Sequence, residues 1–282
     1  MTSSPPCPRR RARPDDTPGS HRCPPRTDRR TFLLAAGGLS LLAGMASVAS
    51  CSKQDTRPVA LIYRGRASCA GCSDAVATVL QHGLTSFRTV FCGPDEKVPL
   101  SASSLAGATV YAQPGGGSVG PAWRRMRQHA DDIRHWVHGG GHYLGFCLGA
   151  YLAAATPGFA LLPGNTNQYI TSPAATVDTT DDTIIPVLWR GKPRHMFFQD
   201  GPIFRLNTGT NATVLATYNN GEPAAVVAPY GFGWVGVVGP HPEADQSWYS
   251  DAGLTNPDGI RPDLSYDLIE TTVHHPVPTK TG

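Results

Sequence analysis

The sequence lacks an apolar run long enough to form a membrane-spanning helix. Its sustained apolar stretch, residues 34–48, covers about 15 residues, whereas a span needs roughly 20. Internal repeats and heptads are also missing, which excludes solenoid and coiled-coil architectures. What is present is an ordinary globular composition, with 40% hydrophobic and 16% charged residues over 282 positions. That length suits one large domain or two small ones.

The net charge gives no support for nucleic-acid binding. The formal total is +3, but residues 1–50 hold eight of the 24 Lys and Arg residues and only three of the 21 acidic residues. The rest of the chain therefore has 16 basic and 18 acidic residues, a net charge of about −2. A folded domain with this balance lacks the excess positive charge that a phosphate backbone attracts.

The first 50 residues predict an export signal. Residues 1–28 are rich in Pro, Arg, Ser and Asp, cannot bury a core and are expected to form a disordered arm. Arg29-Arg30 precede the short apolar run, which is typical of twin-arginine export. The run ends in Val48-Ala49-Ser50-Cys51, which resembles a bacterial lipobox. Such a box implies cleavage before Cys51 and diacylation of its thiol.

These features predict an exported protein that is lipid-anchored to the outer face of the bacterial cytoplasmic membrane. Buried acyl chains contribute about 0.8 kcal/mol per methylene, so several chains together anchor a protein firmly. Residues 51–57 would form a short polar tether. An uncleaved signal anchor and cleavage at another site are the alternatives.

Residues 58–250 are predicted to form one α/β domain. Its first half alternates between apolar strands and helices, with strands at 59–63, 87–92, 109–112 and 142–146, and helices at 73–82, at 121–138 and from 148 onward. This alternation predicts a parallel, doubly wound sheet. In the second half, short β-type runs at 174–177, 184–188, 196–198, 213–216, 224–228 and 234–238 predict an antiparallel extension. Residues 251–282 are rich in Pro and Asp and are predicted to be an irregular tail, with one helical turn at 266–270.

The strongest chemical signal is Gly145-Phe146-Cys147-Leu148-Gly149, placed between a predicted strand and a predicted helix. It is the cysteine counterpart of a nucleophile elbow, whose sharp turn exposes the side chain at the sheet edge. The start of the helix favours the thiolate. The amide of Leu148 would point towards a developing oxyanion, and Gly115 or Gly116, after the third strand, could add a second amide. The alternative is a buried structural thiol among tight glycine turns.

A nucleophilic thiol needs a base, and that base needs an orienting acceptor. His241-Pro242-Glu243 directly follows the predicted strand 234–238. Loops at strand ends carry the sites of α/β proteins, and the spacing of two residues lets both side chains point the same way. Cys147, His241 and Glu243 are therefore predicted to act together.

These motifs resemble the class I glutamine amidotransferase superfamily, and most closely its biotin-protein-ligase N-terminal-domain family. The resemblance covers about residues 58–245 and is carried by segments 113–117, 140–152, 198–202 and 239–243. It implies a flavodoxin-like α/β fold with a β-rich C-terminal half. It also implies Cys147 as nucleophile, His241 as base and Glu243 as the orienting group. The amides of Gly116 and Leu148 would form the oxyanion hole.

The sequence also departs from the family patterns. His142 stands where many glutaminase domains have Pro, which argues against glutamine itself as substrate. Neither a partner synthase domain nor a biotinyl-adenylate loop is found, so biotin ligation is not predicted. The function expected is a cysteine hydrolase or amidase acting on a small-molecule or peptide-like amide, without a metal or other cofactor. The alternative is a catalytically silent binding or scaffolding lipoprotein at the cell envelope.

Other residues leave alternatives open. Cys69 and Cys72 fit a structural disulfide, a redox pair or half of a zinc site, and Cys92 could pair with either of them. Asp200-Gly201-Pro202 is either a β-turn or part of the pocket wall. Arg64 and Arg66 follow the first strand and would either bind a substrate carboxylate or lie in a solvated loop.

Overall fold

The structure is a computed structural model that describes residues 55–275. The segments predicted as export signal, N-terminal arm and lipidation site at Cys51 lie outside these residues, as does most of the predicted tether. Within the described part of the chain, none of the helices has both the length and the apolar character needed to cross a bilayer.

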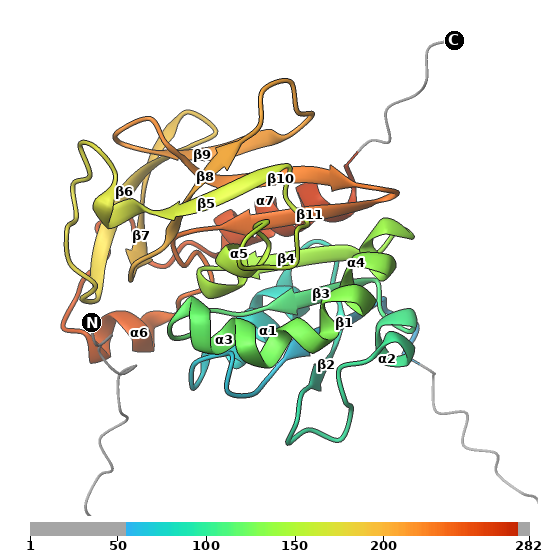
Figure 1. Ribbon diagram of the computed structural model, residues 1–282. Helices are drawn as coiled ribbons and strands as arrows, with labels where there is room; N and C mark the ends of the chain where they lie inside the picture. The colour runs from blue at the N-terminus through green and yellow to red at the C-terminus, as the bar shows by residue number, and fades with distance from the viewer. Residues whose placement is uncertain (1–54, 276–282) are drawn as a thin grey trace, which may run out of the picture. The chain divides into compact units, whose positions relative to one another are not determined.

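A nine-stranded mixed sheet forms the centre of the domain (Figure 1). Its order is β2 (Arg88–Cys92), β1 (Val59–Tyr63), β3 (Val110–Gln113), β4 (His142–Phe146), β11 (Gly233–Val238), β10 (Pro223–Tyr230), β9 (Thr213–Tyr218), β6 (Thr183–Trp189) and β7 (Lys192–Phe198). Neighbouring strands run parallel from β2 to β11 and antiparallel from β11 to β7. Both the parallel sheet and its antiparallel extension are thus confirmed.

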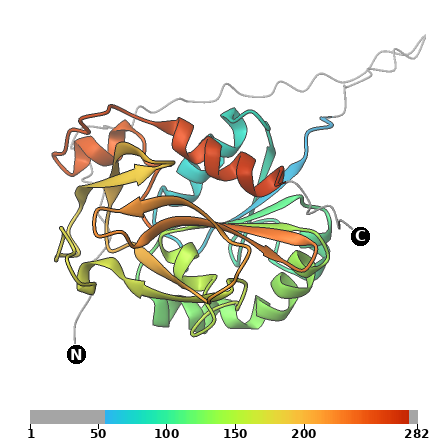
Figure 2. The same cartoon turned by 90° about the horizontal axis from the view of Figure 1, so that it is seen from above.

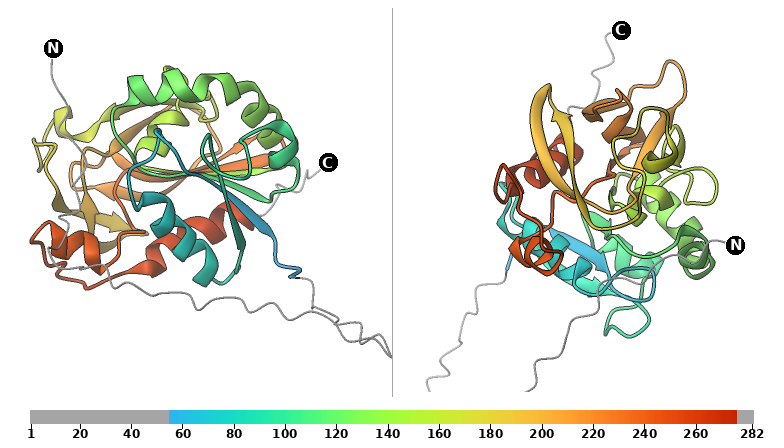
Figure 3. Two further views of the ribbon diagram at one scale, coloured as in Figure 1. Left: turned by 90° about the horizontal axis from the view of Figure 1, so that it is seen from below. Right: turned by 90° about the vertical axis from the view of Figure 1, so that its left-hand side faces the viewer.

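Helices cover both faces of the parallel half (Figures 2 and 3). One face carries α1 (Cys72–His82) and α7 (Pro262–Val273), and the other carries α2 (Ala102–Ala106), α3 (Val119–Met126), α4 (Ala130–His138) and α5 (Leu148–Leu152). The central strands are buried on both sides, so they consist of continuous apolar runs rather than alternating ones. This explains why β1 and β4 could be placed correctly from the sequence.

The prediction of an irregular tail after residue 251 was wrong for residues 262–273, where the helical turn predicted at 266–270 is part of a longer helix. They form α7, which packs on β4, β10 and β11. Pro262 starts the helix, where its missing N–H costs nothing, and Leu264, Leu268 and Ile269 lie on one buried face. The Pro and Asp content of the segment concealed this helical spacing. A shorter helix, α6 (Gln246–Asp251), lies just before it.

Three other expectations also need correction. The predicted strand 174–177 does not form, because the Thr176 amide donates to the hydroxyl of Tyr169 instead of a strand partner. The predicted helix 121–138 is divided into α3 and α4 by a 3-10 turn at Arg127–His129. A two-stranded sheet of β5 (Gly164–Gln168) and β8 (Pro202–Leu206) was not foreseen.

Candidate active site

The predicted elbow is present between β4 and α5. Cys147 has φ 47° and ψ −101°, a conformation that few non-glycine residues adopt. Its flanking glycines are needed for space: a Cβ on Gly145 would lie 2.6 Å from the Gly149 carbonyl oxygen, and one on Gly149 would collide with the Gln113 carbonyl. The Cys147 amide donates to the carbonyl of Val238, at 2.9 Å, which ties the elbow to β11.

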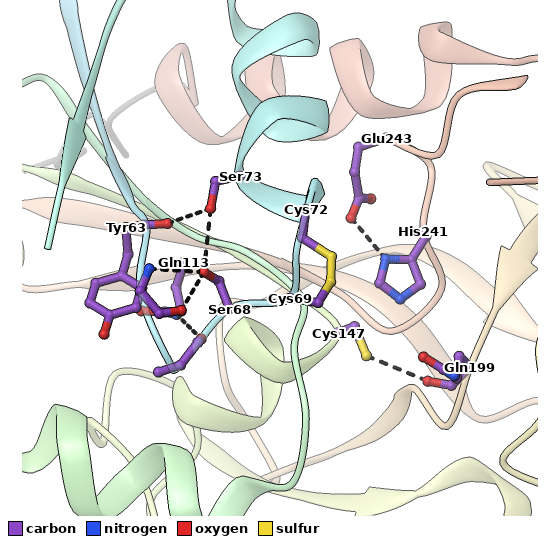
Figure 4. Close-up of a disulfide and its surroundings, with 12 residues drawn as sticks. Tyr63, Ser68, Cys69, Cys72, Ser73, Gln113, Cys147, Gln199, His241 and Glu243 are labelled. Atoms are coloured by element: carbon purple, nitrogen blue, oxygen red, sulfur yellow. Dashed lines mark hydrogen bonds and ion pairs between the residues drawn. A yellow bond between two sulfur atoms is a disulfide. The ribbon is translucent and has the colours of Figure 1, made fainter. Parts of the chain in front are cut away.

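The sheet topology brings the histidine loop to the same edge as the cysteine. β4 and β11 are parallel neighbours, with Phe146 in register with Val238. Both chains therefore leave the sheet at its carboxyl edge, one to Cys147 and the other to His241. Figure 4 shows these two side chains and Glu243 gathered at this edge.

His241 and Glu243 form a buried hydrogen-bonded pair. His241 Nδ1 lies 2.8 Å from Glu243 Oε1, and both residues are at least 96% buried. The histidine backbone is fixed as well, because its amide donates to the Phe197 carbonyl at 2.8 Å. Its ring packs against Phe197 and Trp248, with centroid distances of 6.0 and 5.1 Å. The imidazole therefore has one orientation, with Nε2 left for another partner.

The pKa of His241 is raised to about 10. Burial by itself lowers this pKa, but the negative charge of Glu243 and the charge and hydrogen bond of Cys147 together outweigh it. The imidazolium is thus the favoured state at neutral pH. The influence of Cys147 on this pKa agrees with the two side chains being neighbours at the same sheet edge.

Gly115 is the residue that allows this approach. A Cβ there would lie 2.8 Å from His241 Cε1 and 3.7 Å from Cys147 Cβ, so any larger residue would displace the imidazole. The Cys147 thiol also donates to the carbonyl of Gln199, with a distance of 3.6 Å from sulfur to oxygen (Figure 4).

A cavity of about 300 Å³ opens beside the thiol. Its lining includes Gly116, Cys147, Leu148, Tyr151 and Asp200. Within residues 55–275, neither the Gly116 amide nor the Leu148 amide has a hydrogen-bond acceptor. Two unsatisfied donors beside a nucleophile are what the oxyanion of an acyl-transfer reaction requires, and they are the two that the resemblance implies.

The remaining cysteines take separate roles. Cys69 and Cys72 form a disulfide at the start of α1, and the Cys69 amide donates to the Gly115 carbonyl at 2.9 Å. The disulfide loop therefore supports the glycine loop of the site. Cys92 is unpaired and buried, and burial, together with the charge of Glu96, raises its pKa to about 12.

Two other candidates do not reach the cavity. His142 is the first residue of β4 and so lies at the end of the strand opposite Cys147. Arg64 pairs with Asp74 and Glu96 and lies over the ring of Phe91, so its charge is already engaged. Neither Arg64 nor Arg66 lines the cavity beside the thiol.

Comparison with solved structures shows that the chain shares its α/β fold with a GMP synthase subunit. A GMP synthase subunit from Thermoplasma acidophilum is 12% identical, with a TM-score of 0.50 over 78% of this chain and 96% of that chain. PurLQS from Thermotoga maritima is 15% identical, with a TM-score of 0.49 over 76% of this chain and 98% of that chain. At such identities the similarity concerns the fold alone.

A family model supports part of the resemblance seen in the sequence. The model described as biotin-protein ligase, N terminal, matches residues 59–173. The matched span contains Gly116, Cys147 and Leu148 but ends before His241 and Glu243. The comparison with curated proteins gave no match.

Tyr151 and Gln168 are among the residues of the cavity wall that sequence reasoning overlooked. Tyr151 follows the elbow in α5, and Gln168 ends the unforeseen strand β5. Tyr151 could have been found from its helical spacing of one turn after Cys147. Gln168 had no signal, because its strand is polar and its partner β8 lies over 30 residues away.

Proposed function

We propose that this protein is a cysteine-dependent hydrolase that cleaves an amide bond. The observation that carries the proposal is the buried His241–Glu243 pair beside Cys147. Cys147 itself stands on an elbow and lines a cavity. A buried ion pair is costly unless its partners are fixed, and perturbed ionisable groups of this kind cluster at functional sites. The amidotransferase-like fold agrees with an amidase or hydrolase role.

In the first half of the proposed reaction, the Cys147 thiolate attacks the carbonyl carbon of the amide. A C–S bond forms, and the oxygen becomes an oxyanion that receives hydrogen bonds from the Gly116 and Leu148 amides. The C–N bond then breaks as His241 gives its Nε2 proton to the leaving amine. The raised pKa of His241 suits this step, because the proton is already in place.

In the second half, His241 acts as a base. The negative charge of Cys147 is one of the causes of the raised pKa, and it disappears when the thiolate becomes a thioester. The pKa of His241 therefore falls, and the neutral imidazole can take a proton from an attacking water. The C–S bond breaks, a carboxylic acid leaves, and the thiolate–imidazolium pair is restored.

The test is alkylation of Cys147 by iodoacetamide at pH 7, followed by mass spectrometry of the peptide that contains it. His241→Ala is expected to slow alkylation by about tenfold or more, because the imidazolium no longer stabilises the thiolate. Gly115→Ala is expected to do the same by displacing the ring. Gly107→Ala is the matched control, since its Cβ would meet only the Ser104 carbonyl oxygen, at 3.8 Å, and Gly107 lies outside the cavity lining.

A binding or scaffolding role is the second candidate. It is favoured by the 6% exposure of Cys147 and by the hydrogen bond of its thiol to Gln199, which together describe a resting thiol. Equal alkylation rates in all four proteins, or no alkylation of Cys147 in the wild type, would support this role and overturn the hydrolase. Biotin ligation is no part of either proposal.

We further propose that the protein is exported by a twin-arginine signal and lipid-anchored through Cys51 at the cell envelope. Replacing Arg29-Arg30 by two lysines should leave the precursor in the cytoplasm of a bacterial host. Cys51→Ala should abolish incorporation of a labelled fatty acid, whereas Cys23→Ala, which alters a cysteine before the predicted cleavage point, should leave that incorporation unchanged. Equal lipid labelling of the Cys51→Ala protein and the wild type would contradict the anchor.

A further inference from the structure

The turn between β7 and β8, residues 199–201, forms one wall of the cavity. Gln199 accepts the hydrogen bond from the Cys147 thiol, and Asp200 follows with φ 50°, in the left-handed region. A Cβ on Gly201 would collide with the carbonyl of Gly239, two residues before His241. The turn is therefore packed against the histidine loop, and the position of Asp200 relative to the thiol is fixed.

Asp200 is held from three sides. Its carbonyl accepts from the Tyr151 hydroxyl at 3.1 Å, and its Oδ2 accepts from Gln168 Nε2 at 2.8 Å. The carbonyl of the next residue, Gly201, accepts from the Tyr169 amide at 3.2 Å. A non-glycine residue in a left-handed conformation costs free energy, and so do the groups ordered around it. Such a cost at the wall of a candidate active site points to a role in that site.

These contacts leave one oxygen of the Asp200 carboxylate without a hydrogen bond. Its Oδ1 is buried and has no hydrogen-bond partner in the described part of the chain. A buried acceptor without a donor is unfavourable. Burial raises the pKa of Asp200, and the hydrogen bond from Gln168 acts in the opposite direction. Among the described residues, Gln168 is thus the one side chain that donates to this carboxylate, and a cationic ligand in the cavity would favour its charged form.

The charge of the wall selects between kinds of ligand. Among the residues that line the cavity, Asp200 is the one carboxylate and none is Lys or Arg. Asp182 lies two positions after the lining residue Thr180 and interacts with the charge of His241. A substrate with a carboxylate or phosphate beside the reacting amide would meet the negative charge of Asp200, and no Lys or Arg of the cavity lining would compensate it. A protonated amine would be attracted.

We propose that Asp200 is a specificity-determining residue whose carboxylate binds a protonated amine of the substrate, so that the substrate class is an amine-bearing amide. The proposal rests on the hydrolase function proposed above. Asp200 is not a catalytic residue in this scheme, since the reacting atoms meet Cys147 and His241. It places the substrate so that the carbonyl carbon faces the thiol.

The experiment compares two thiol reagents that share a leaving group and differ in charge. Full-length protein is treated with the cationic trimethylammonioethyl methanethiosulfonate or with the anionic sulfonatoethyl methanethiosulfonate, and modification of Cys147 is followed by mass spectrometry. The thiolate attacks the sulfenyl sulfur, a disulfide forms and methanesulfinate leaves. The ratio of the two rates reports the charge around the thiol.

Asp200→Asn is expected to lower the cation-to-anion rate ratio by at least about fivefold. Asparagine tolerates the left-handed conformation, so the fold should persist. The rate with neutral iodoacetamide should stay within about twofold. Asp178→Asn, which removes an exposed carboxylate outside the cavity lining, should leave the ratio unchanged. An equal ratio in the wild type and Asp200→Asn would overturn the proposal.

This result is independent of the test of the hydrolase. If His241→Ala alkylates as fast as the wild type while Asp200→Asn still lowers the ratio, the hydrolase fails and the amine site stands. If Cys147 reacts with no reagent, the melting temperature decides the question. Cationic glycinamide should then raise the melting temperature of the wild type but not that of Asp200→Asn. Neutral N-acetylglycinamide should raise neither, and equal effects of the two amides on the wild type would overturn the site.

Discussion

Replacing Gly149 with alanine is expected to lower the free energy of unfolding by about 3 kcal/mol. The new methyl group would collide with the carbonyl of Gln113, the last residue of β3. That strand cannot move aside, because it is paired on both edges, with β1 and β4. The Gln113 side chain is anchored too, donating to the Ala67 carbonyl and accepting from the Tyr111 hydroxyl.

Urea unfolding followed by circular dichroism measures this effect. Gly117→Ala is the matched control, because it adds the same methyl group in the loop after β3, at a position where nothing lies within 4 Å. Its unfolding free energy should stay within about 1 kcal/mol of the wild type. A Gly149→Ala protein as stable as this control would show that α5 can move away from β3, and the elbow would not be the rigid support that the proposed chemistry needs.

The parallel half of the fold was predictable because its strands are short apolar runs between strong turn signals. The bounds of β1 and β4 follow directly from Val59–Tyr63 and His142–Phe146. Strand β5 could not be found in this way, since Gly164–Gln168 is polar and mostly exposed. Its position depends on pairing with β8, a contact between distant segments that local sequence patterns do not encode.

The candidate site was predictable to a similar extent. The loops around Cys147 and His241 could both be predicted, because the elbow and the His-Pro-Glu segment are local patterns. Other side chains of the cavity wall, such as Gln168, could not be predicted in this way. Asp200-Gly201-Pro202 fits both a β-turn and the pocket wall in the sequence, and both interpretations hold, because the turn packs on Gly239 and Asp200 lines the cavity.

The second large effect concerns pH. In the unfolded chain the pKa of His241 should be near its ordinary value of 6.5, and in the folded protein it is about 10. The folded state therefore binds the proton more tightly. The resulting stabilisation is fully present below pH 6.5 and is lost as the pH rises through 10. The contribution of His241 to the free energy of unfolding should therefore fall between pH 6.5 and 9.

Glu243→Gln provides the control for this prediction. The substitution keeps the shape and removes the negative charge that does most to raise the pKa of His241. The variant should be less stable than the wild type at pH 6, and its stability should change by less than about 1 kcal/mol up to pH 9. Urea unfolding at a series of pH values gives both curves.

The pH window also separates His241 from other buried groups. In the folded protein the pKa of Cys92 is raised to about 12 and that of Tyr111 is raised well above 10. Above about pH 9 both groups would therefore lose their protons in the unfolded chain before they do so in the folded protein. Both groups are present in the wild type and in Glu243→Gln, so the difference between the two curves belongs to the His241–Glu243 pair. Parallel curves would mean that His241 is neutral at pH 7 in the folded protein. The imidazolium would then not be available to protonate a leaving amine, and the proposed first half of the reaction would fail.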